Sequence, residues 1–430
     1  MDIGKSRNSS GTLKASPKDG SPKPQQLRPS TITETICFIL CTTSPLVVIY
    51  YWIAYHYFDT SIIAAARTSY SEGLIQFFAI RFPHPSIAAI LGYSTWLVLQ
   101  AILYIYLPGS ETLGPLTPAG RRLRYKLNGL AAWVATVALW IAGSTLGIFD
   151  PAYIAKNWES LIWAINVFSL HPRIGNMWDW RHFFFPSIYP HEQKGLIFAG
   201  SNLNVSDLSF AAFQYQTHGH LTNTMVAVVF LRGWVVVDFF VNEDWFLHTL
   251  DGMYESFGFY NIYGFSAMMP VLWSLQTQYL AKCPTELSHL NLLGVILLYI
   301  IGWSIRFSAD YQKVKFRQTR GEYSIWGRKG EGIKASYQTT DGKSHQILLL
   351  CSGWWGLARH ANYTGSTMYT LALCAACGNG GIFPYTEVII LIGLHIHRCY
   401  RDEAKCAAKY GTDWDEYCRR VPWRMIPGLF

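Results

Sequence analysis

Residues 288–308 read SHLNLLGVILLYIIGWSIRFS, and this stretch decides the fold class. It is almost entirely apolar over about the 20 residues that a helix needs to cross ~30 Å of hydrocarbon. A helix satisfies its own backbone hydrogen bonds in lipid, so the stretch is expected to be a transmembrane helix.

Similar stretches recur along the chain. They lie at roughly 35–58, 86–107, 127–149, 221–241, 264–281, 346–377 and 382–397, with a shorter, undecided run at 160–170. We therefore expect an all-α fold, a polytopic transmembrane helical bundle of about eight to ten spans. The 346–377 run is long and interrupted by Gly353, Arg359 and His360, which predicts two half-length helices that meet at a polar break.

The composition agrees with a membrane protein. Of the 430 residues, 50% are apolar and 14% are charged, whereas soluble globular proteins carry roughly 25% charged residues. This balance excludes a disordered, collagen-like or nucleic-acid-binding main body. The nine cysteines lie mostly in apolar runs, where they act as small hydrophobic residues, so neither a disulfide framework nor a metal site is expected.

The net charge of +8 is concentrated in a few polar segments. Residues 1–30 carry six Lys or Arg and no aromatic residue, and they are expected to form a disordered basic cytosolic tail. The cluster at 121–126 and the segments 309–345 and 398–430 are also basic, and the positive-inside rule predicts that they share the cytosolic side with this tail. The segment 238–261 is the opposite case, with five acidic residues and no Lys or Arg.

The last hundred residues combine apolar sequence with many charged and polar groups. If 397–410 is helical, Asp402, Cys406 and Lys409 with Tyr410 share one face. Lys313 and Arg317 are four residues apart, so both cations can point at one anion. Fixed cations beside aromatic rings suit a phosphorylated ligand such as a dinucleotide, although a basic fringe with interfacial aromatic residues would look similar.

At these residues the sequence resembles the sterol reductases of the endoplasmic reticulum. The resemblance covers roughly 165–430, and the first 160 residues match in hydropathy alone. It rests on HPRIG (171–175), LSFAA (208–212), HGHLTN (218–223), DFFVNE (238–243), FGFY (257–260), KVKFR (313–317), WGRK (326–329), SGWWGLARHANYTG (352–365), RCYRDE (398–403), KYG (409–411) and VPWRMIPG (421–428).

The resemblance implies a division of the chain into 1–30 (tail), 31–160 (N-terminal membrane spans) and 161–430 (sterol reductase core), with an NADPH-binding region at about 309–430 that forms a C-terminal, cytosol-facing cofactor pocket. The loop before SGWWG is most similar to the delta-7 branch of the family. That branch reduces the 7,8 double bond of 5,7-diene sterols with NADPH. A sterol carbon-14 reductase and a non-catalytic sterol-binding or scaffold protein of the same fold remain alternatives.

The resemblance also implies the environment and partners of the protein. It implies a multi-pass protein of the endoplasmic reticulum membrane, with a 5,7-diene sterol substrate and the lipid bilayer as partners. Other enzymes of sterol biosynthesis are further candidate partners, and a nucleic acid is not expected as a partner.

The family's functional residues map onto positions of this chain. The implied cofactor-binding residues are Lys313, Arg317, Leu350, Trp355, Arg359, His360, Asn362, Tyr363, Arg398, Asp402, Cys406, Ala407, Ala408, Lys409, Tyr410 and Tyr417. Lys313 and Arg317 match phosphate contacts, and Asp402 matches a carboxylate at the nicotinamide end. For the catalytic proton, Asp402, Tyr260, Tyr254 and Glu243 are candidates. One departure is Ser366, where the family usually has Asp; a hydroxyl can still hydrogen-bond, but without charge.

Overall fold

The fold is seen in a computed structural model that describes residues 31–116, 122–170, 195–249, 263–339 and 341–430. The predicted tail, the HPRIG motif, Tyr254 and Tyr260 lie outside these residues. The protein is mostly helical, so the predicted fold class of a helical membrane protein is confirmed.

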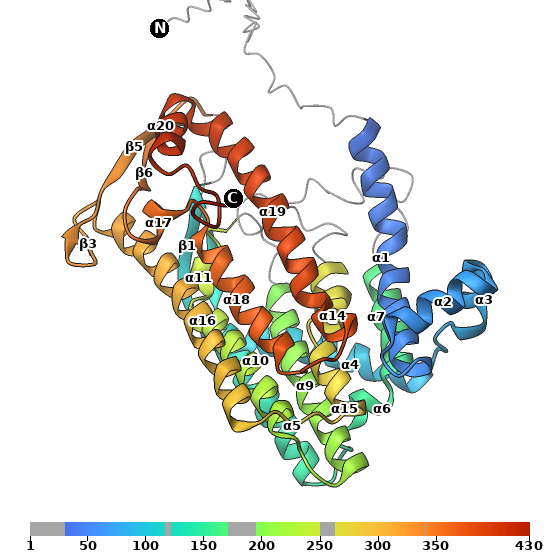
Figure 1. Ribbon diagram of the computed structural model, residues 1–430. Coiled ribbons are helices and arrows are strands. Elements are labelled where there is room, and N and C mark those ends of the chain that lie inside the picture. The colour runs from blue at the N-terminus through green and yellow to red at the C-terminus, as the bar shows by residue number, and fades with distance from the viewer. Residues whose placement is uncertain (1–30, 117–121, 171–194, 250–262, 340) are drawn as a thin grey trace, which may run out of the picture.

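The helices of the first half lie mostly in the lower and right-hand parts of Figure 1. They are α1 (Thr31–Tyr57), α2 (Ile62–Glu72), α3 (Leu74–Arg81), α4 (Ile87–Tyr106), α5 (Gly129–Thr145), α6 (Tyr153–Lys156), α7 (Trp158–Leu170), α9 (Gly195–His218), α10 (Asn223–Val241) and α11 (Glu243–Phe246). The run at 160–170, undecided from the sequence, is thus the helix α7.

The second half continues, among the described residues, with a short π-helix and seven α-helices. They are η3 (Gly264–Met268), α14 (Met269–Leu272), α15 (Leu275–Lys282), α16 (His289–Gln318), α17 (Trp354–Leu357), α18 (Ala361–Ala375), α19 (Ile382–Tyr410) and α20 (Thr412–Arg420). Helix α16 begins where the Ser288 hydroxyl accepts a hydrogen bond from Asn291 N at 3.3 Å, and it runs unbroken to Gln318. The polar half 398–410 continues the apolar half of α19, which confirms the helix predicted there.

Three antiparallel two-stranded hairpins accompany the helices. They are β1 (Ser110–Leu116) with β2 (Arg122–Leu127), β3 (Ser324–Ile325) with β4 (Arg328–Lys329), and β5 (Gly332–Gln338) with β6 (Ser344–Leu350). In β5–β6, Ile333 pairs with Leu349 and Ala335 with Ile347. One face of this hairpin buries Ile333, Ala335 and Leu349 against Trp414 and Tyr417 of α20.

The prediction for 346–377 was therefore wrong in its first half. Residues up to Leu350 form strand β6, and only the part from Ala361 forms a helix, α18. The apolar run of β6 pairs with β5 and packs on α20, which stabilises a strand instead of a membrane helix. The polar break itself was correctly placed, since α17 and the start of α18 occupy it.

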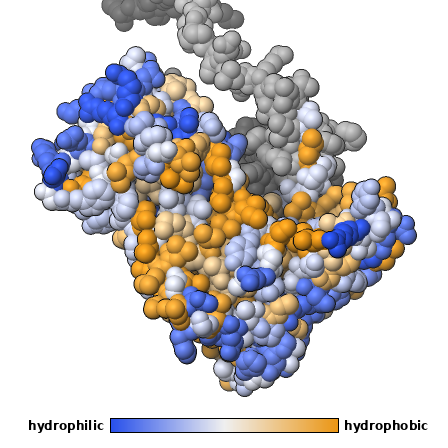
Figure 2. Space-filling model, in the orientation of Figure 1, coloured by the Kyte–Doolittle hydropathy of each residue, from blue (hydrophilic) through white to orange (hydrophobic). Residues whose placement is uncertain are grey.

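Three helices of the described residues are long and apolar enough to cross a membrane, namely α4, α10 and α16. Helix α5 is apolar but shorter. Figure 2 shows apolar residues across the middle of the molecule and hydrophilic residues at its two ends, one of which carries α20 and β5–β6. This distribution fits a protein embedded in a bilayer, while the expected total of about eight to ten spans stays a prediction.

Helices α16 and α18 cross at two glycines, and this crossing positions the polar end of the bundle. A Cβ atom added to Gly302 would lie 2.6 Å from Tyr369 N and 2.8 Å from Gly365 O. A Cβ added to Gly365 would lie 2.5 Å from Gly302 O and 2.6 Å from Arg306 N. Small residues allow two membrane helices to pack backbone against backbone. Because α16 and α18 run antiparallel here, the crossing brings the turns of α16 that follow it close to the turn of α18 that precedes it.

We predict that Gly302→Ala destabilises the protein by about 1–3 kcal/mol, because backbone atoms cannot move aside as a flexible side chain would. The thermal unfolding midpoint in detergent measures this effect. Gly294→Ala is the matched control, since it lies in the same helix and a Cβ there meets nothing within 4 Å. Equal midpoints for the two variants would show that the crossing tolerates an extra methyl group.

Candidate functional site

Two cations lie one turn apart near the end of α16. Lys313 Nζ is 3.6 Å from Asp310 Oδ1 and 4.1 Å from the centroid of the Trp355 ring. Arg317 Nε donates a hydrogen bond to Leu348 O at 3.1 Å. Among the described residues this bond uses only Nε, so the two terminal nitrogens of Arg317 remain available for an anion.

The segment between β6 and α18 packs against α16 and supports these cations. Trp355 Nε1 donates to Ala309 O at 2.7 Å, and Leu350 is buried with Phe316 and Trp355. Gly353 adopts a φ of 64°, and a Cβ atom there would meet the Gln312 side chain at 2.3 Å. The glycine is therefore required both by its backbone conformation and by its close approach to α16.

The first turn of α18 places Asn362 and Tyr363. Asn362 Nδ2 donates to Asp310 Oδ1 at 3.1 Å, so it reaches the same carboxylate as Lys313. The Tyr363 ring lies between two imidazoles, with centroids 5.0 Å from His360 and 4.5 Å from His395 and nearly parallel planes. Both faces of Tyr363 are thus covered, and the ring can offer a ligand its edge and hydroxyl but not a stacking face.

His360, which directly precedes α18, faces Asp402 of α19, with His360 Nε2 3.8 Å from Asp402 Oδ2. Burial, followed by the charges of Lys313 and Arg359, lowers the pKa of His360 to about 3, so this imidazole is neutral near pH 7. Asp402 lies beyond the apolar half of α19. Burial raises the pKa of its carboxyl, and the charges of Lys313 and Lys405 partly offset this effect.

Aromatic and basic groups of α19 and α20 complete one side of the cluster. Arg317 interacts electrostatically with Tyr410, Tyr417, Cys406 and Asp402, and Cys406 Sγ is 3.8 Å from Asp402 Oδ2. Lys409 Nζ lies 4.0 Å from the centroid of the Tyr337 ring on β5. Tyr417 is buried, and this burial raises the pKa of its hydroxyl.

The structure thus brings together most of the residues singled out from the sequence. We call them the α16–α20 cluster, which comprises Lys313, Arg317, Leu350, Trp355, His360, Asn362, Tyr363, Asp402, Cys406, Lys409, Tyr410 and Tyr417. They come from five helices and the β5–β6 hairpin, which Figure 1 shows at one end of the molecule.

Four other predicted residues lie differently. Arg359 is buried and donates to Val421 O at 2.7 Å, to Pro422 O at 3.1 Å and to Glu403 Oε1 at 2.5 Å, so it holds the C-terminal segment. Arg398 is half-buried on α19, whereas Ala407 and Ala408 are exposed.

The predicted acid Glu243 lies at the start of α11. Its Oε2 accepts a hydrogen bond from Gly129 N at 3.0 Å, at the N-terminus of α5. A carboxylate is stabilised at that end of a helix, which gives Glu243 a structural partner.

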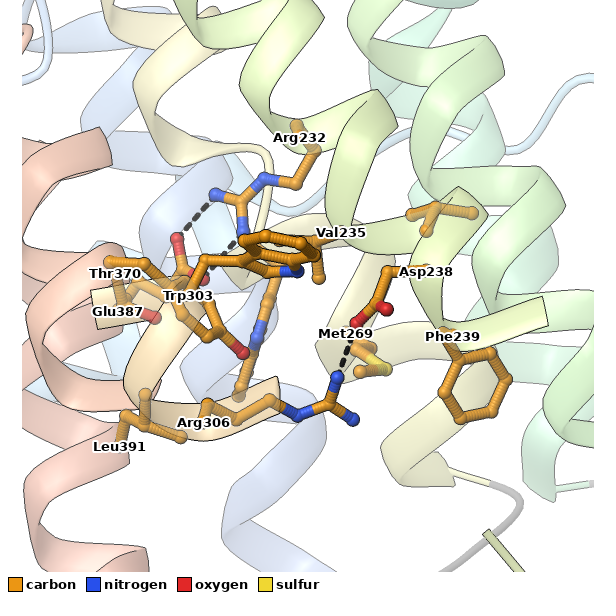
Figure 3. Close-up of a pocket in the computed structure, with 13 residues that line it drawn as sticks. Arg232, Val235, Asp238, Phe239, Met269, Trp303, Arg306, Thr370, Glu387 and Leu391 are labelled. Atoms are coloured by element: carbon orange, nitrogen blue, oxygen red, sulfur yellow. Dashed lines mark hydrogen bonds and ion pairs between the residues drawn. The ribbon is translucent and has the colours of Figure 1, made fainter. Parts of the chain in front are cut away.

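A cavity of about 200 Å³ lies deeper in the bundle (Figure 3). The lining residues are Arg232, Val235, Val236, Asp238 and Phe239 of α10, Met269 of α14 with Trp273 directly after it, Trp303 and Arg306 of α16, Tyr369 and Thr370 of α18, and Glu387 and Leu391 of α19.

Two ion pairs between lining residues form part of the cavity wall. Arg232 donates to both carboxylate oxygens of Glu387, at 2.7 and 2.6 Å, although the two side chains are only 3% and 0% exposed. Arg306 pairs with Asp238, as Figure 3 shows. Within the described residues, Arg232 Nε is buried without a hydrogen-bond partner. The cavity therefore combines apolar walls with polar groups that can orient a ligand.

Three of these four charges, Arg232, Arg306 and Glu387, were not expected from the sequence to form a site, whereas Asp238 belongs to the quoted DFFVNE motif. A charged residue inside an apolar segment usually faces a polar cavity and often marks function. In the sequence, Arg359 and His360 stand out because they interrupt the apolar run 346–377, but Arg232, Arg306 and Glu387 also stand within predicted spans. Ser366, the position that departs from the family pattern, lies on α18, three residues before Tyr369 of the cavity wall.

Comparison with known proteins identifies the family. The chain matches the ergosterol biosynthesis ERG4/ERG24 family over residues 30–175 and 169–430. It is 35% identical to a 7-dehydrocholesterol reductase of Xenopus laevis, with 92% of each chain covered, and 35% identical to one of Danio rerio, with 81% of each covered. A delta(14)-sterol reductase of Methylotuvimicrobium alcaliphilum is 30% identical, with 91% of this chain and 94% of that protein covered. The chain therefore belongs to the ERG4/ERG24 family of sterol reductases.

Proposed function

We propose that this protein reduces the 7,8 double bond of 5,7-diene sterols with NADPH, as an enzyme of the endoplasmic reticulum membrane. The observation that carries the proposal is the α16–α20 cluster, in which two cations, a raised-pKa carboxyl and several aromatic rings converge. The two relatives at 35% identity are both named 7-dehydrocholesterol reductase.

The chemistry of the cluster fits NADPH. Arg317 and Lys313 supply positive charge for phosphate groups, and the terminal nitrogens of Arg317 can bind one phosphate in a bidentate manner. Asn362 and the Tyr363 hydroxyl offer polar contacts. Tyr410 is half-buried and can present its ring to an aromatic base, whereas Tyr417 is buried against Trp414. When bound, NADPH supplies a hydride to the sterol.

The cavity supports the sterol part of the proposal. Val235, Phe239, Met269 and Leu391 give it apolar walls, while the pair of Arg306 and Asp238 gives it a polar side. Its volume of about 200 Å³ is below that of pockets that hold a whole drug-sized ligand. The cavity therefore accommodates one end of a sterol, such as the end that carries the hydroxyl group.

The reaction needs a proton donor as well as a hydride, because protonation of carbon 8 leaves a cation at carbon 7 that the neighbouring double bond stabilises. Asp402 fits this role best among the described candidates. Its carboxyl lies in the cluster beside the neutral His360, and burial raises its pKa toward the range where it can hold a proton.

Reduction at carbon 14 is the second candidate. It is favoured by the 30% identity with the delta(14)-sterol reductase over nearly the whole length of both chains. Both reactions add a proton and a hydride across a carbon–carbon double bond, so the same cluster serves either one, and the product decides between them.

The test is incubation of membranes containing this protein with NADPH and a 5,7-diene sterol. We expect the conjugated-diene absorbance to disappear. A protein that leaves this sterol unchanged but removes a 14,15 double bond from another substrate is a carbon-14 reductase. Binding of both sterols without turnover of either would contradict an enzymatic function.

We predict that Arg317→Ala raises the Michaelis constant for NADPH by about tenfold or more, because a hydrogen bond to a charged group contributes roughly 1.5–3 kcal/mol. The constant for the sterol should change far less. Lys315→Ala is the control, since it removes a cation from the same helix two residues away, on another face. Equal effects of the two substitutions would argue against a phosphate contact at Arg317.

We predict that Arg359→Gln acts mainly on stability. It leaves the carbonyls of Val421 and Pro422 without their side-chain donor and removes one of the two arginines that pair with Glu403, since Arg424 remains. Loss of a partner by buried acceptors costs about 1–3 kcal/mol. The thermal midpoint should fall, while the folded fraction keeps a nearly normal Michaelis constant for NADPH. A normal midpoint together with weak NADPH binding would instead make Arg359 a direct cofactor contact.

A further inference from the structure

Asp310 is the carboxylate around which the polar groups of α16 and α18 are arranged. Its Oδ1 accepts a hydrogen bond from Asn362 Nδ2 at 3.1 Å and lies 3.6 Å from Lys313 Nζ. Its Oδ2 lies 3.5 Å from Arg306 Nε. One carboxyl group thus contacts two cations of its own helix and the amide of a neighbouring helix.

Arg306 contacts the second carboxylate oxygen of Asp310, the one that faces away from Lys313 and Asn362. The guanidinium of Arg306 pairs at once with Asp310 and with Asp238 of α10, so its orientation is determined by two carboxylates. The backbone of Arg306 is also packed against Gly365 at the helix crossing. Asp310 consequently has a fixed counter-ion on one side and the two candidate nucleotide contacts, Lys313 and Asn362, on the other.

The row of charged groups that runs from Asp238 through Arg306 and Asp310 to Lys313 contains two negative and two positive charges, so its net charge is zero. Asp238 and Asp310 are paired with Arg306 and Lys313, and every neighbouring pair is within 4 Å. Lys313 also lies over the Trp355 ring, so its ammonium group is held both by that ring and by Asp310. A long Lys side chain that would otherwise sample many rotamers is thereby restricted to one direction.

We infer that Asp310 is a positioning residue for the nucleotide site: it orients Lys313 and the Asn362 amide so that both present their remaining donors to the same phosphorylated ligand. The inference deepens the proposed function and rests on it. It assigns to a negative charge a favourable effect on the binding of a negatively charged cofactor.

This sign makes the inference testable. If Asp310 only added negative charge near the phosphates, its removal would tighten NADPH binding, because an unfavourable Coulomb interaction would be lost. If Asp310 orients Lys313 and Asn362, its removal weakens binding, because pre-organised contacts become mobile.

The experiment measures the dissociation constant of NADPH for the full-length protein in detergent. We expect Asp310→Asn to raise this constant about tenfold, the effect of one charge-assisted hydrogen bond. An unchanged or lower constant would overturn the inference. Glu322→Gln is the control, because it also removes a carboxylate paired with a lysine, Lys329, but both side chains are about 70% exposed.

A second variant covers the case in which Asp310→Asn does not fold. Asp310→Glu keeps the charge and moves the carboxylate by one methylene group. A positioning role predicts weaker NADPH binding for this variant as well, whereas a role of charge alone predicts the value of the unmodified protein, and that result would contradict the inference.

A double-mutant cycle then shows whether Asp310 acts through Lys313. In a Lys313→Ala background, the effect of Asp310→Asn should shrink by at least half, because the main group to be oriented is gone. A full effect in that background would mean that Asp310 acts elsewhere. Failure of the unmodified protein to bind NADPH would count against the proposed function, and is thus distinguishable from failure of the inference.

Discussion

The close crossing of α16 and α18 at Gly302 and Gly365 is the constraint on which the polar end of the molecule depends. Because the two backbones touch there, the turn of α16 that contains Asp310 and the first turn of α18 stay within hydrogen-bond distance. Asp310 of one helix consequently meets Asn362 of the other. Without this approach, Lys313 and Asn362 would belong to separate surfaces, and no shared ligand could contact both.

The cluster combines residues that contact a ligand with residues that hold the structure in place. Arg359 and Glu403 close the C-terminal segment over α18 and α19, and the covered ring of Tyr363 joins the same two helices through His360 and His395. Arg317 differs, since most of its donors are unused within the described part of the chain. A motif that matches a family therefore contains both kinds of residue, and the structure separates them.

The sequence predicted the helical membrane fold well, because apolar length and few charges are direct consequences of crossing lipid. It also placed Asp402, Cys406 and Lys409 on one helix, and Lys313 and Arg317 on another, from spacing alone. It failed at 346–350, where an apolar run became strand β6 because its partner β5 and the cover of α20 come from distant sequence. It likewise overlooked Asp310 and Arg306, since their importance comes from contacts with other helices that local spacing does not reveal.

The pair of Arg232 and Glu387 has a consequence for how the protein is made. The two residues are separated by 155 positions in the chain, so α10 is synthesised long before α19. An arginine at the centre of a membrane helix costs about 2.5–3.5 kcal/mol on insertion, and during this interval Arg232 lacks its acidic partner. Until α19 supplies Glu387, Arg232 therefore depends on Asp207 of the earlier helix α9, a second carboxylate with which it interacts electrostatically.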